Sequence, residues 1–246
     1  MARIIYLLFG ALAYLIFFAT FLYLIAFVGD LAVVPRTVDR GGADLGAGAA
    51  AGIDLALVAL FGLQHSVMAR QGFKRAWSRL VPKPIERSAY VLFASLALIL
   101  MFAFWAPIAG DLWTVENSVG RTVLWALFAL GWLIVLLSTF LISHFELFGL
   151  AQVWNNLQGK AAAAPVFRQP FFYRFVRHPL YSGFFLAFWS TPRMSWGHLL
   201  LAAAMSIYML IAIRFEERDL VDLFGADYEA YRARVGMLSP RVRRRP

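Results

Sequence analysis

No cysteine occurs among the 246 residues of this sequence, and charged residues are scarce. Without cysteine the chain has no disulfide, no thiolate-ligated metal site and no cysteine nucleophile. Charged residues make up 15% of the chain, whereas soluble domains average about 25%. Hydrophobic residues make up 61%, and long apolar runs recur. The composition therefore predicts a polytopic integral membrane protein.

Motifs for metal and dinucleotide binding are also missing. The four histidines show no HExxH spacing, and without cysteine beside them they predict no metal site. No GxGxxG turn is present. The lack of that turn excludes little, because membrane enzymes bind nucleotides without it.

Positive charge exceeds negative charge, with 23 Lys and Arg residues, 14 Asp and Glu residues and a net charge of +9. Such a balance can indicate a nucleic-acid partner. In a membrane protein, the positive-inside bias of cytoplasmic loops explains the same excess. We therefore expect the lipid bilayer as a partner, and no nucleic acid.

The apolar runs predict an all-α fold, a helical bundle of four full membrane spans and a C-terminal helical hairpin, or five to six transmembrane segments. The predicted spans are residues 4–28, 47–68, 88–109 and 121–143, and the predicted hairpin joins residues 179–191 to residues 196–213. The first run is longer than the hydrophobic region of a cleaved signal peptide, so it is expected to be a retained span. We expect residues 1–246 to form a single membrane domain.

The first arm of the hairpin, residues 179–191, is short. A helix of this length is about 20 Å long, at 1.5 Å per residue, and the hydrocarbon core is roughly 30 Å thick. This arm is therefore expected to be tilted or only partly embedded. Pro179 suits the first position of a helix, which places His178 at the N-cap.

The basic residues are spread unevenly over the loops. The N-terminus and residues 70–87, 144–178 and 214–246 hold 1, 6, 4 and 8 Lys and Arg residues, and the loops on the other side hold 4. The positive-inside rule then places both termini, and the last two segments, in the cytoplasm. The segment 70–87 interleaves aromatic and basic side chains, so it is expected to lie on the membrane surface.

Two dense polar clusters follow apolar stretches in the last third of the chain. One lies in residues 171–185, FFYRFVRHPLYSGFF, and the other in residues 213–223, IRFEERDLVDL. Unpaired charges are costly beside hydrocarbon, so this many polar groups indicates a function. The polar residues are Arg177, His178, Tyr181, Arg214, Glu216, Glu217 and Arg218. We expect the two segments to meet at the cytoplasmic membrane surface and to hold a polar cofactor.

Helical geometry suggests how these residues act. His178 at a helix N-terminus would lie at the positive end of the helix dipole, where an anionic ligand group also binds. Arg214 and Arg218, four residues apart, share one face. Glu216 and Glu217 project about 100° apart, so one can pair with an arginine while the other accepts hydrogen bonds from a ribose diol or an amino group. A capping histidine and a solvated, salt-bridged helix end are the structural alternatives.

Several stretches resemble known membrane enzymes. RHPLYSG, then RFEERDL and FGADYEAYRARV, resemble the C-terminal signature of integral-membrane methyltransferases, a group that includes isoprenylcysteine carboxyl methyltransferases and bacterial phospholipid methyltransferases. Three further stretches resemble the nurim-like family and, within it, the bacterial methanethiol S-methyltransferases. They are QHSVMAR at residues 64–70, IERSAYVLF at residues 85–93 and HFELFGLAQVW at residues 144–154. The resemblance covers most of the chain from about residue 60 onward.

The resemblance implies S-adenosylmethionine as the cofactor and methanethiol, a small thiol, as the substrate, with dimethyl sulfide as the product. It also implies a bacterial inner membrane. Together with the two clusters it identifies seven candidate cofactor-binding residues: Tyr173, Arg177, His178, Tyr181, Arg214, Glu216 and Glu217.

Methyl transfer to sulfur requires an aligned donor and acceptor, exclusion of water and a thiolate. A base with a pKa near neutrality therefore helps. His144 and His65 each lie near the cytoplasmic end of a predicted span. We expect His144 to be the base, with Glu146 as its orienting partner and His65 as the second candidate. For each histidine the alternative is an interfacial side chain bonded to backbone.

Three other functions stay open at this point. The same machinery could methylate a lipid amine or an isoprenylcysteine carboxylate. The chain could be a non-catalytic membrane scaffold of the nurim type, or a membrane reductase of the sterol-reductase type that uses NADPH. A small thiol needs only a compact aromatic cavity, whereas a lipid substrate needs a groove open to the bilayer. The sequence is compatible with either kind of site.

Overall fold

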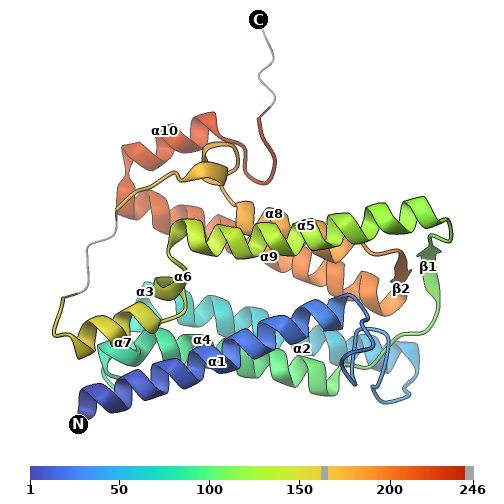
Figure 1. Ribbon diagram of the computed structural model, residues 1–246, viewed down its shortest axis with the longest axis horizontal. Coiled ribbons are helices and arrows are strands. Elements are labelled where there is room, and N and C mark those ends of the chain that lie inside the picture. The colour runs from blue at the N-terminus through green and yellow to red at the C-terminus, as the bar shows by residue number, and fades with distance from the viewer. Residues whose placement is uncertain (162–165, 242–246) are drawn as a thin grey trace, which may run out of the picture. The chain divides into compact units, whose positions relative to one another are not determined.

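A computed structural model describes residues 1–161 and 166–241 of the chain. These residues are mainly helical, with one short pair of strands (Figure 1). The predicted cytoplasmic segments 144–178 and 214–246 also contain residues 162–165 and 242–246. For those residues, the prediction lies outside the described part of the chain.

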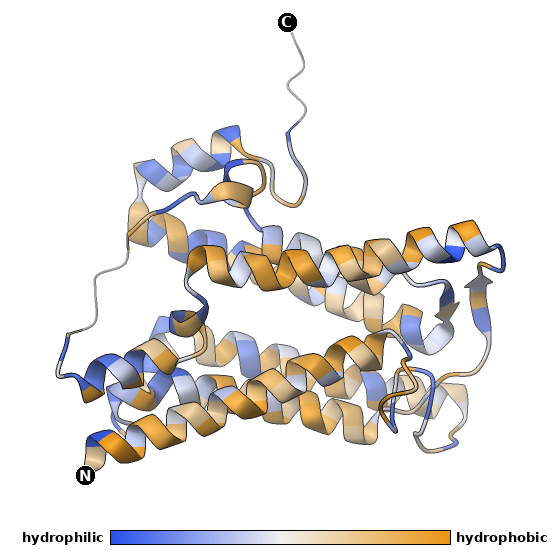
Figure 2. Cartoon of the chain, viewed as in Figure 1, coloured by the Kyte–Doolittle hydropathy of each residue, from blue (hydrophilic) through white to orange (hydrophobic). Residues whose placement is uncertain are grey.

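Five helices of the described residues are long and apolar enough to cross a membrane. They are α1 (Ala2–Val28), α2 (Ala47–Ala69), α4 (Lys83–Phe104), α5 (Ser118–Ile142) and α9 (Trp196–Phe224). Figure 2 shows hydrophobic residues along α1 and α5 and mainly hydrophilic ones on α10 (Ala226–Arg234). The prediction of a polytopic membrane helical bundle is confirmed. As expected, the first arm of the hairpin, α8 (Pro179–Trp189), is short, with 11 residues.

The third span does not match its predicted bounds, residues 88–109. α4 begins earlier because Pro84 lies in its first turn, where the missing N–H of proline costs nothing. It ends at Phe104 because Trp105 is extended, with φ −56° and ψ 131°, and Pro107 follows.

The second arm of the hairpin is longer than predicted. The sequence predicts an end at residue 213, but α9 continues through the charged cluster to Phe224. No proline or glycine interrupts the helical spacing of those charges until Gly225, whose φ of 54° ends the helix. The second polar cluster is therefore presented on a continuous helix, which is a more rigid support than a loop.

One antiparallel strand pair departs from the all-α prediction. It joins β1 (Asp111–Thr114) to β2 (Arg193–Ser195), which lie in the two loops that precede α5 and α9. Arg193 Nε donates to Asp111 Oδ1 at 2.9 Å across the pair.

The described residues divide into two compact units. The first contains residues 1–114, 144–161 and 193–204, and the second contains residues 115–143, 166–192 and 205–241. In the first unit, α1 and α2 both pack against α4. The short helices of this unit are α3 (Gln71–Trp77), α6 (His144–Leu147) and α7 (Leu150–Leu157). The single membrane domain expected from the sequence stays a prediction.

Buried polar contacts fix the chain where α4 ends in the first unit. The Trp105 indole Nε1 donates to the Val38 carbonyl at 3.0 Å, and the Trp105 side chain is almost fully buried. The Ala106 N–H donates to Asp54 Oδ1 at 2.9 Å. Both contacts satisfy polar groups that would otherwise be costly inside a membrane bundle.

In the second unit, α5 and α8 approach each other closely at two glycines. A Cβ atom on Gly183 would lie 2.6 Å from the Gly131 carbonyl oxygen and 2.9 Å from the Val135 amide nitrogen. Small residues permit such close approach of membrane helices. Gly183 belongs to the RHPLYSG stretch and thus holds α8, with His178 at its start, against α5.

We predict that Gly183→Ala lowers stability, because the added methyl group meets backbone atoms that cannot rotate away. Overpacking of this kind costs about 1–3 kcal/mol. Thermal unfolding in detergent should show a lower midpoint. Gly52→Ala in α2 is the matched control, since a Cβ atom on Gly52 would have no neighbouring atom within 4 Å. Equal midpoints for the two variants would contradict the prediction.

Candidate functional site

His178 and Pro179 start α8 as predicted. Pro179 occupies the first turn, and His178 is the N-cap residue with non-helical angles, φ −125° and ψ 63°. The His178 side chain makes no capping hydrogen bond to the helix end. It contacts the second polar cluster instead.

Glu217 joins the two predicted clusters. Its Oε1 atom accepts a hydrogen bond from Arg177 Nε at 2.7 Å and lies 3.0 Å from His178 Nε2. The side chains of Arg177, His178 and Glu217 are only 10%, 4% and 13% exposed. The expected meeting of residues 171–185 with residues 213–223 is thus confirmed. Because both contacts are made through Oε1, the carboxylate can use Oε2 for another partner.

The Arg177 guanidinium also binds the C-terminal segment of the described chain. Its Nη1 donates to the carbonyls of Arg232, at 3.2 Å, and Val235, at 2.5 Å. Backbone hydrogen bonds run alongside, from the Arg177 N–H to Gly236 and from the His178 N–H to Met237. We call residues 235–238 the C-terminal clasp, because they hold the start of α8 by main-chain contacts.

Aromatic residues of α10 support the clasp. Tyr228, Tyr231 and Val235 form a buried cluster, and the Tyr231 hydroxyl donates to the Tyr173 carbonyl at 2.5 Å. Burial raises the pKa of Tyr231 to about 12 and raises the pKa of Tyr173 as well. Both phenols therefore stay protonated at neutral pH, and Tyr231 remains a hydrogen-bond donor.

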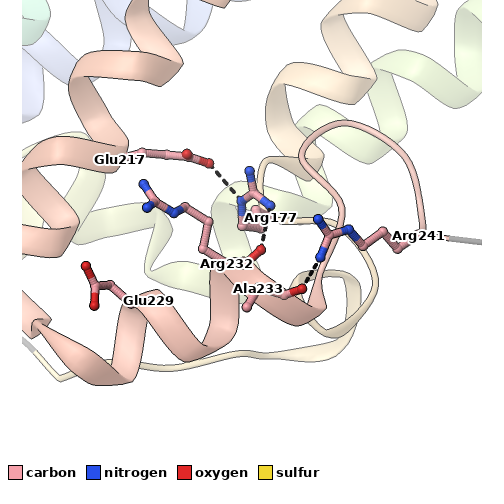
Figure 3. A pocket seen from close by; sticks show the side chains of 6 residues that line it. All are labelled: Arg177, Glu217, Glu229, Arg232, Ala233 and Arg241. Carbon is pink, nitrogen blue, oxygen red and sulfur yellow. Dashed lines mark hydrogen bonds and ion pairs between the residues drawn. The ribbon is translucent and has the colours of Figure 1, made fainter. Parts of the chain in front are cut away.

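A cavity of about 480 Å³ opens beside these groups. Figure 3 shows the side chains around it, which come from the segment just before α8, from α9, from α10 and from the residues after α10. Its lining residues are Arg177, Glu217, Glu229, Arg232, Ala233 and Arg241. Three arginines and two glutamates provide charges of both signs, which suits a ligand that itself carries both signs.

The other predicted cofactor residues lie around this centre. The Tyr181 ring, three residues along the chain from His178, lies 5.7 Å from the His178 ring. Glu216 Oε2 is 3.9 Å from His178 Nδ1, and the Glu216 side chain is 46% exposed. Arg214 is exposed on α9. The arginine that pairs with Glu217 is Arg177, from the other cluster, rather than Arg214 or Arg218.

His144, the predicted base, begins α6 in the first unit. Its side chain is buried, and its Nε2 is hydrogen bonded to the Tyr14 hydroxyl at 2.8 Å. Burial lowers the pKa of His144, so the imidazole is neutral at neutral pH and can accept a proton. Glu146, its predicted orienting partner, has an exposed side chain, and its carbonyl accepts from Gln152.

His65, the second candidate base, lies on α2 between two aromatic rings. The ring centroids of Phe61 and Tyr90 are 5.4 and 5.0 Å from that of His65. Arg87 lies over the Tyr90 ring, and its Nε donates to the Leu147 carbonyl at 2.7 Å. Residues of the three stretches that resemble nurim-like proteins are therefore in contact within the first unit.

Sequence reasoning missed several residues of the site. Glu229, Arg232 and Arg241 line the cavity, yet they belong to an exposed, charged stretch of a kind common on any surface. The YEAYRARV stretch received no predicted role for its individual residues, although two tyrosines at helical spacing beside basic residues could have indicated a packed face. The sequence pattern did not indicate a role for Tyr14. This residue lies within the apolar run of residues 4–28, where a tyrosine is expected to serve in packing.

Comparison with known proteins gives close relatives over nearly the whole chain. The chain is 54% identical over 234 residues to methanethiol S-methyltransferase 1 of Bradyrhizobium diazoefficiens, a match of 95% of this chain and 81% of that relative. It is 51% identical over 240 residues to methanethiol S-methyltransferase of Mycobacterium tuberculosis, a match of 98% of each chain. Nurim of Pan troglodytes is 30% identical over 175 residues, or 68% of this chain and 66% of nurim. No family model matches the chain, and no solved structure does.

Proposed function

Because this chain belongs to the methanethiol S-methyltransferase family, we propose that it is a membrane methyltransferase that converts methanethiol to dimethyl sulfide. The observation that carries the proposal is identity of about half the residues over nearly the full length of named methanethiol S-methyltransferases. The more distant nurim relative shares a smaller part of the chain, so the thiol enzymes are the better guide to function.

We further propose S-adenosylmethionine as the methyl donor, and the residues around the cavity fit it. The donor carries a carboxylate, an ammonium group, a ribose diol and a positively charged sulfur. The arginines at positions 232 and 241 would hold its carboxylate, because guanidinium groups bind carboxylates strongly. Glu217 and Glu229 would accept hydrogen bonds from its ammonium group or ribose hydroxyls.

The residues behind the cavity keep Glu217 ready for this role. Arg177 and His178 both bind Oε1, which fixes the carboxylate and leaves Oε2 to the ligand. His178 donates from Nε2 in this contact, because a carboxylate oxygen can only accept. The C-terminal clasp holds Arg177 in turn. Tyr173, Tyr181, Arg214 and Glu216 stay proposed cofactor contacts.

When bound, S-adenosylmethionine supplies an electrophilic methyl group, which bonds to the thiolate sulfur while the donor sulfur keeps the electron pair of the broken bond. The thiolate is the reactive form of the acceptor. We propose that His144 takes the thiol proton onto its neutral imidazole and leaves the electron pair on the sulfur. His65 stays the second candidate and Glu146 a proposed orienting group.

We propose that the protein lies in a bacterial inner membrane with both termini in the cytoplasm. The uneven distribution of Lys and Arg supports this orientation. This orientation would place Arg177, His178 and Glu217 on the cytoplasmic side, where S-adenosylmethionine is made. Reporter fusions at each terminus and in residues 110–117 test it, and a cytoplasmic signal from that loop would contradict it.

The proposed function is tested by incubating the purified protein with methanethiol and S-adenosylmethionine and measuring dimethyl sulfide in the headspace. We expect dimethyl sulfide that depends on protein and on both reactants. A labelled methyl group in the lipid fraction instead would indicate a lipid substrate. No product, with no binding of S-adenosylmethionine by calorimetry, would favour a scaffold.

A further inference from the structure

Tyr14 brings a hydroxyl from the first helix to the proposed base. Its oxygen lies 2.8 Å from the His144 imidazole nitrogen Nε2, although the two residues are 130 positions apart in the sequence. Tyr14 lies midway along α1, far from either end, so anchoring at a membrane interface does not explain its hydroxyl. A polar group in an apolar helix is costly unless it is hydrogen bonded, and here its bond is to the proposed base.

The surroundings of His144 hold the ring in one orientation. The rings of Tyr14, Phe145 and Phe148 lie 5.8, 5.3 and 4.9 Å from the imidazole, each edge-on to it. Phe148 stacks on Phe17 of α1 at 3.8 Å. Helix α1 therefore supports His144 both by the hydrogen bond and through Phe148.

We propose that Tyr14 is a positioning residue for the methyl-transfer reaction, which orients the His144 imidazole and stays hydrogen bonded to it in both of its protonation states. The inference rests on the proposed function, in which His144 accepts the thiol proton. It assigns a role in the reaction to α1, the part of the chain in which the sequence shows no motif.

The chemistry of a phenol suits this role. In the neutral ring the Tyr14 oxygen accepts from Nε2–H, so Nδ1 is the nitrogen that takes a proton, and the oxygen still accepts from Nε2–H once the ring is protonated. As the thiol S–H bond breaks, its proton moves to Nδ1 and the electron pair stays on sulfur. The Tyr14 oxygen then accepts from the imidazolium, which would otherwise be buried with one fewer hydrogen bond.

Charged residues on the helices around His144 are engaged elsewhere or exposed. Arg87 of α4 directs its Nε to the Leu147 carbonyl, one turn from His144. Glu146 of α6 has an exposed side chain. Helix α7 carries no charged residue. The removal of the Tyr14 hydroxyl should therefore affect the histidine directly.

The test compares Tyr14→Phe with Tyr23→Phe. Both variants remove one hydroxyl from α1, but Tyr23 donates to the Arg36 carbonyl and not to a histidine. We expect Tyr14→Phe to lower kcat about tenfold, with KM for methanethiol changed less than about twofold, and to shift the acid limb of the rate profile to lower pH. Tyr14→Gln, which restores a donor and an acceptor, should recover part of the rate. Tyr23→Phe should match the unchanged protein.

A second readout does not depend on turnover. In protein with isotopically labelled histidine, the His144 signal is identified by its loss in His144→Ala and followed by NMR as the pH changes. The pH at the midpoint of the His144 titration should be lower in Tyr14→Phe than in the wild-type protein, and it should be unchanged in Tyr23→Phe. An unchanged midpoint and rate profile in folded Tyr14→Phe would overturn the proposal. If His144→Ala keeps full activity, the assignment of His144 as the base is wrong. If the wild-type protein makes no dimethyl sulfide, the proposed function is wrong.

Discussion

Glu217→Gln is expected to weaken S-adenosylmethionine binding roughly 30-fold or more. The variant keeps the size of the side chain but removes the charge that Arg177 and His178 share at 2.7 and 3.0 Å. Glu217 is proposed to bind the ammonium group or ribose hydroxyls of the donor, and the loss of one partner of a buried, charged hydrogen bond between ligand and protein costs about 2–5 kcal/mol, where each 1.4 kcal/mol is about tenfold in affinity. Titration calorimetry on the purified protein measures the effect.

Asp222→Asn is the matched control for this experiment. It removes the same charge from the same helix, but Asp222 is exposed and does not line the cavity. We expect its affinity to stay within about twofold, as for most surface changes. If Glu217→Gln binds S-adenosylmethionine as tightly as this control does, the cavity beside Glu217 does not hold the donor.

His144→Ala should lower turnover by about 100-fold or more at neutral pH while it leaves S-adenosylmethionine affinity within about twofold. Loss of a general base typically costs about 10²–10⁴ in rate. Raising the pH should recover part of the rate, because hydroxide then ionises the thiol without help. Headspace rates and calorimetry on the same preparation separate the two effects.

The pH dependence of the unchanged protein has a definite sign. Burial lowers the pKa of His144 below the ordinary histidine value of about 6.5. In the proposed mechanism the neutral imidazole is the active form, so the rate should hold as the pH falls to about 6.5 and decline only below it. His144→Ala should lack this acid limb. A limb that persists in His144→Ala but vanishes in His65→Ala would transfer the role of base to His65.

Much of the fold was predictable because apolar length and proline position have direct physical consequences. The five long apolar runs form helices, and Pro179 places His178 at an N-cap. Errors arose at two helix ends, one of them determined partly by a side chain far along the chain and the other by a glycine. The end of α4 depends on contacts made by Asp54 and on Pro107, and the length of α9 depends on where a glycine first allows a positive φ.

The candidate site was predicted only in part for a similar reason. Charge density in an apolar chain identified Arg177, His178 and Glu217, and their meeting is confirmed. The pairing itself was not predictable, because Glu217 has arginines close by on its own helix, Arg214 and Arg218. It pairs instead with Arg177, which carbonyls of Arg232 and of the C-terminal clasp hold in place. Main-chain carbonyls carry no sequence signal, so no motif could indicate this support.

The C-terminal clasp has a consequence for biosynthesis. Arg177 and Glu217 leave the ribosome before residues 235–238, whose carbonyls bind the guanidinium and the start of α8. A nascent chain, or one cut short by a premature stop codon, would carry both charges without this main-chain support. The proposed donor site would thus be completed only near the end of translation, and truncated products would be expected to reach the membrane without it.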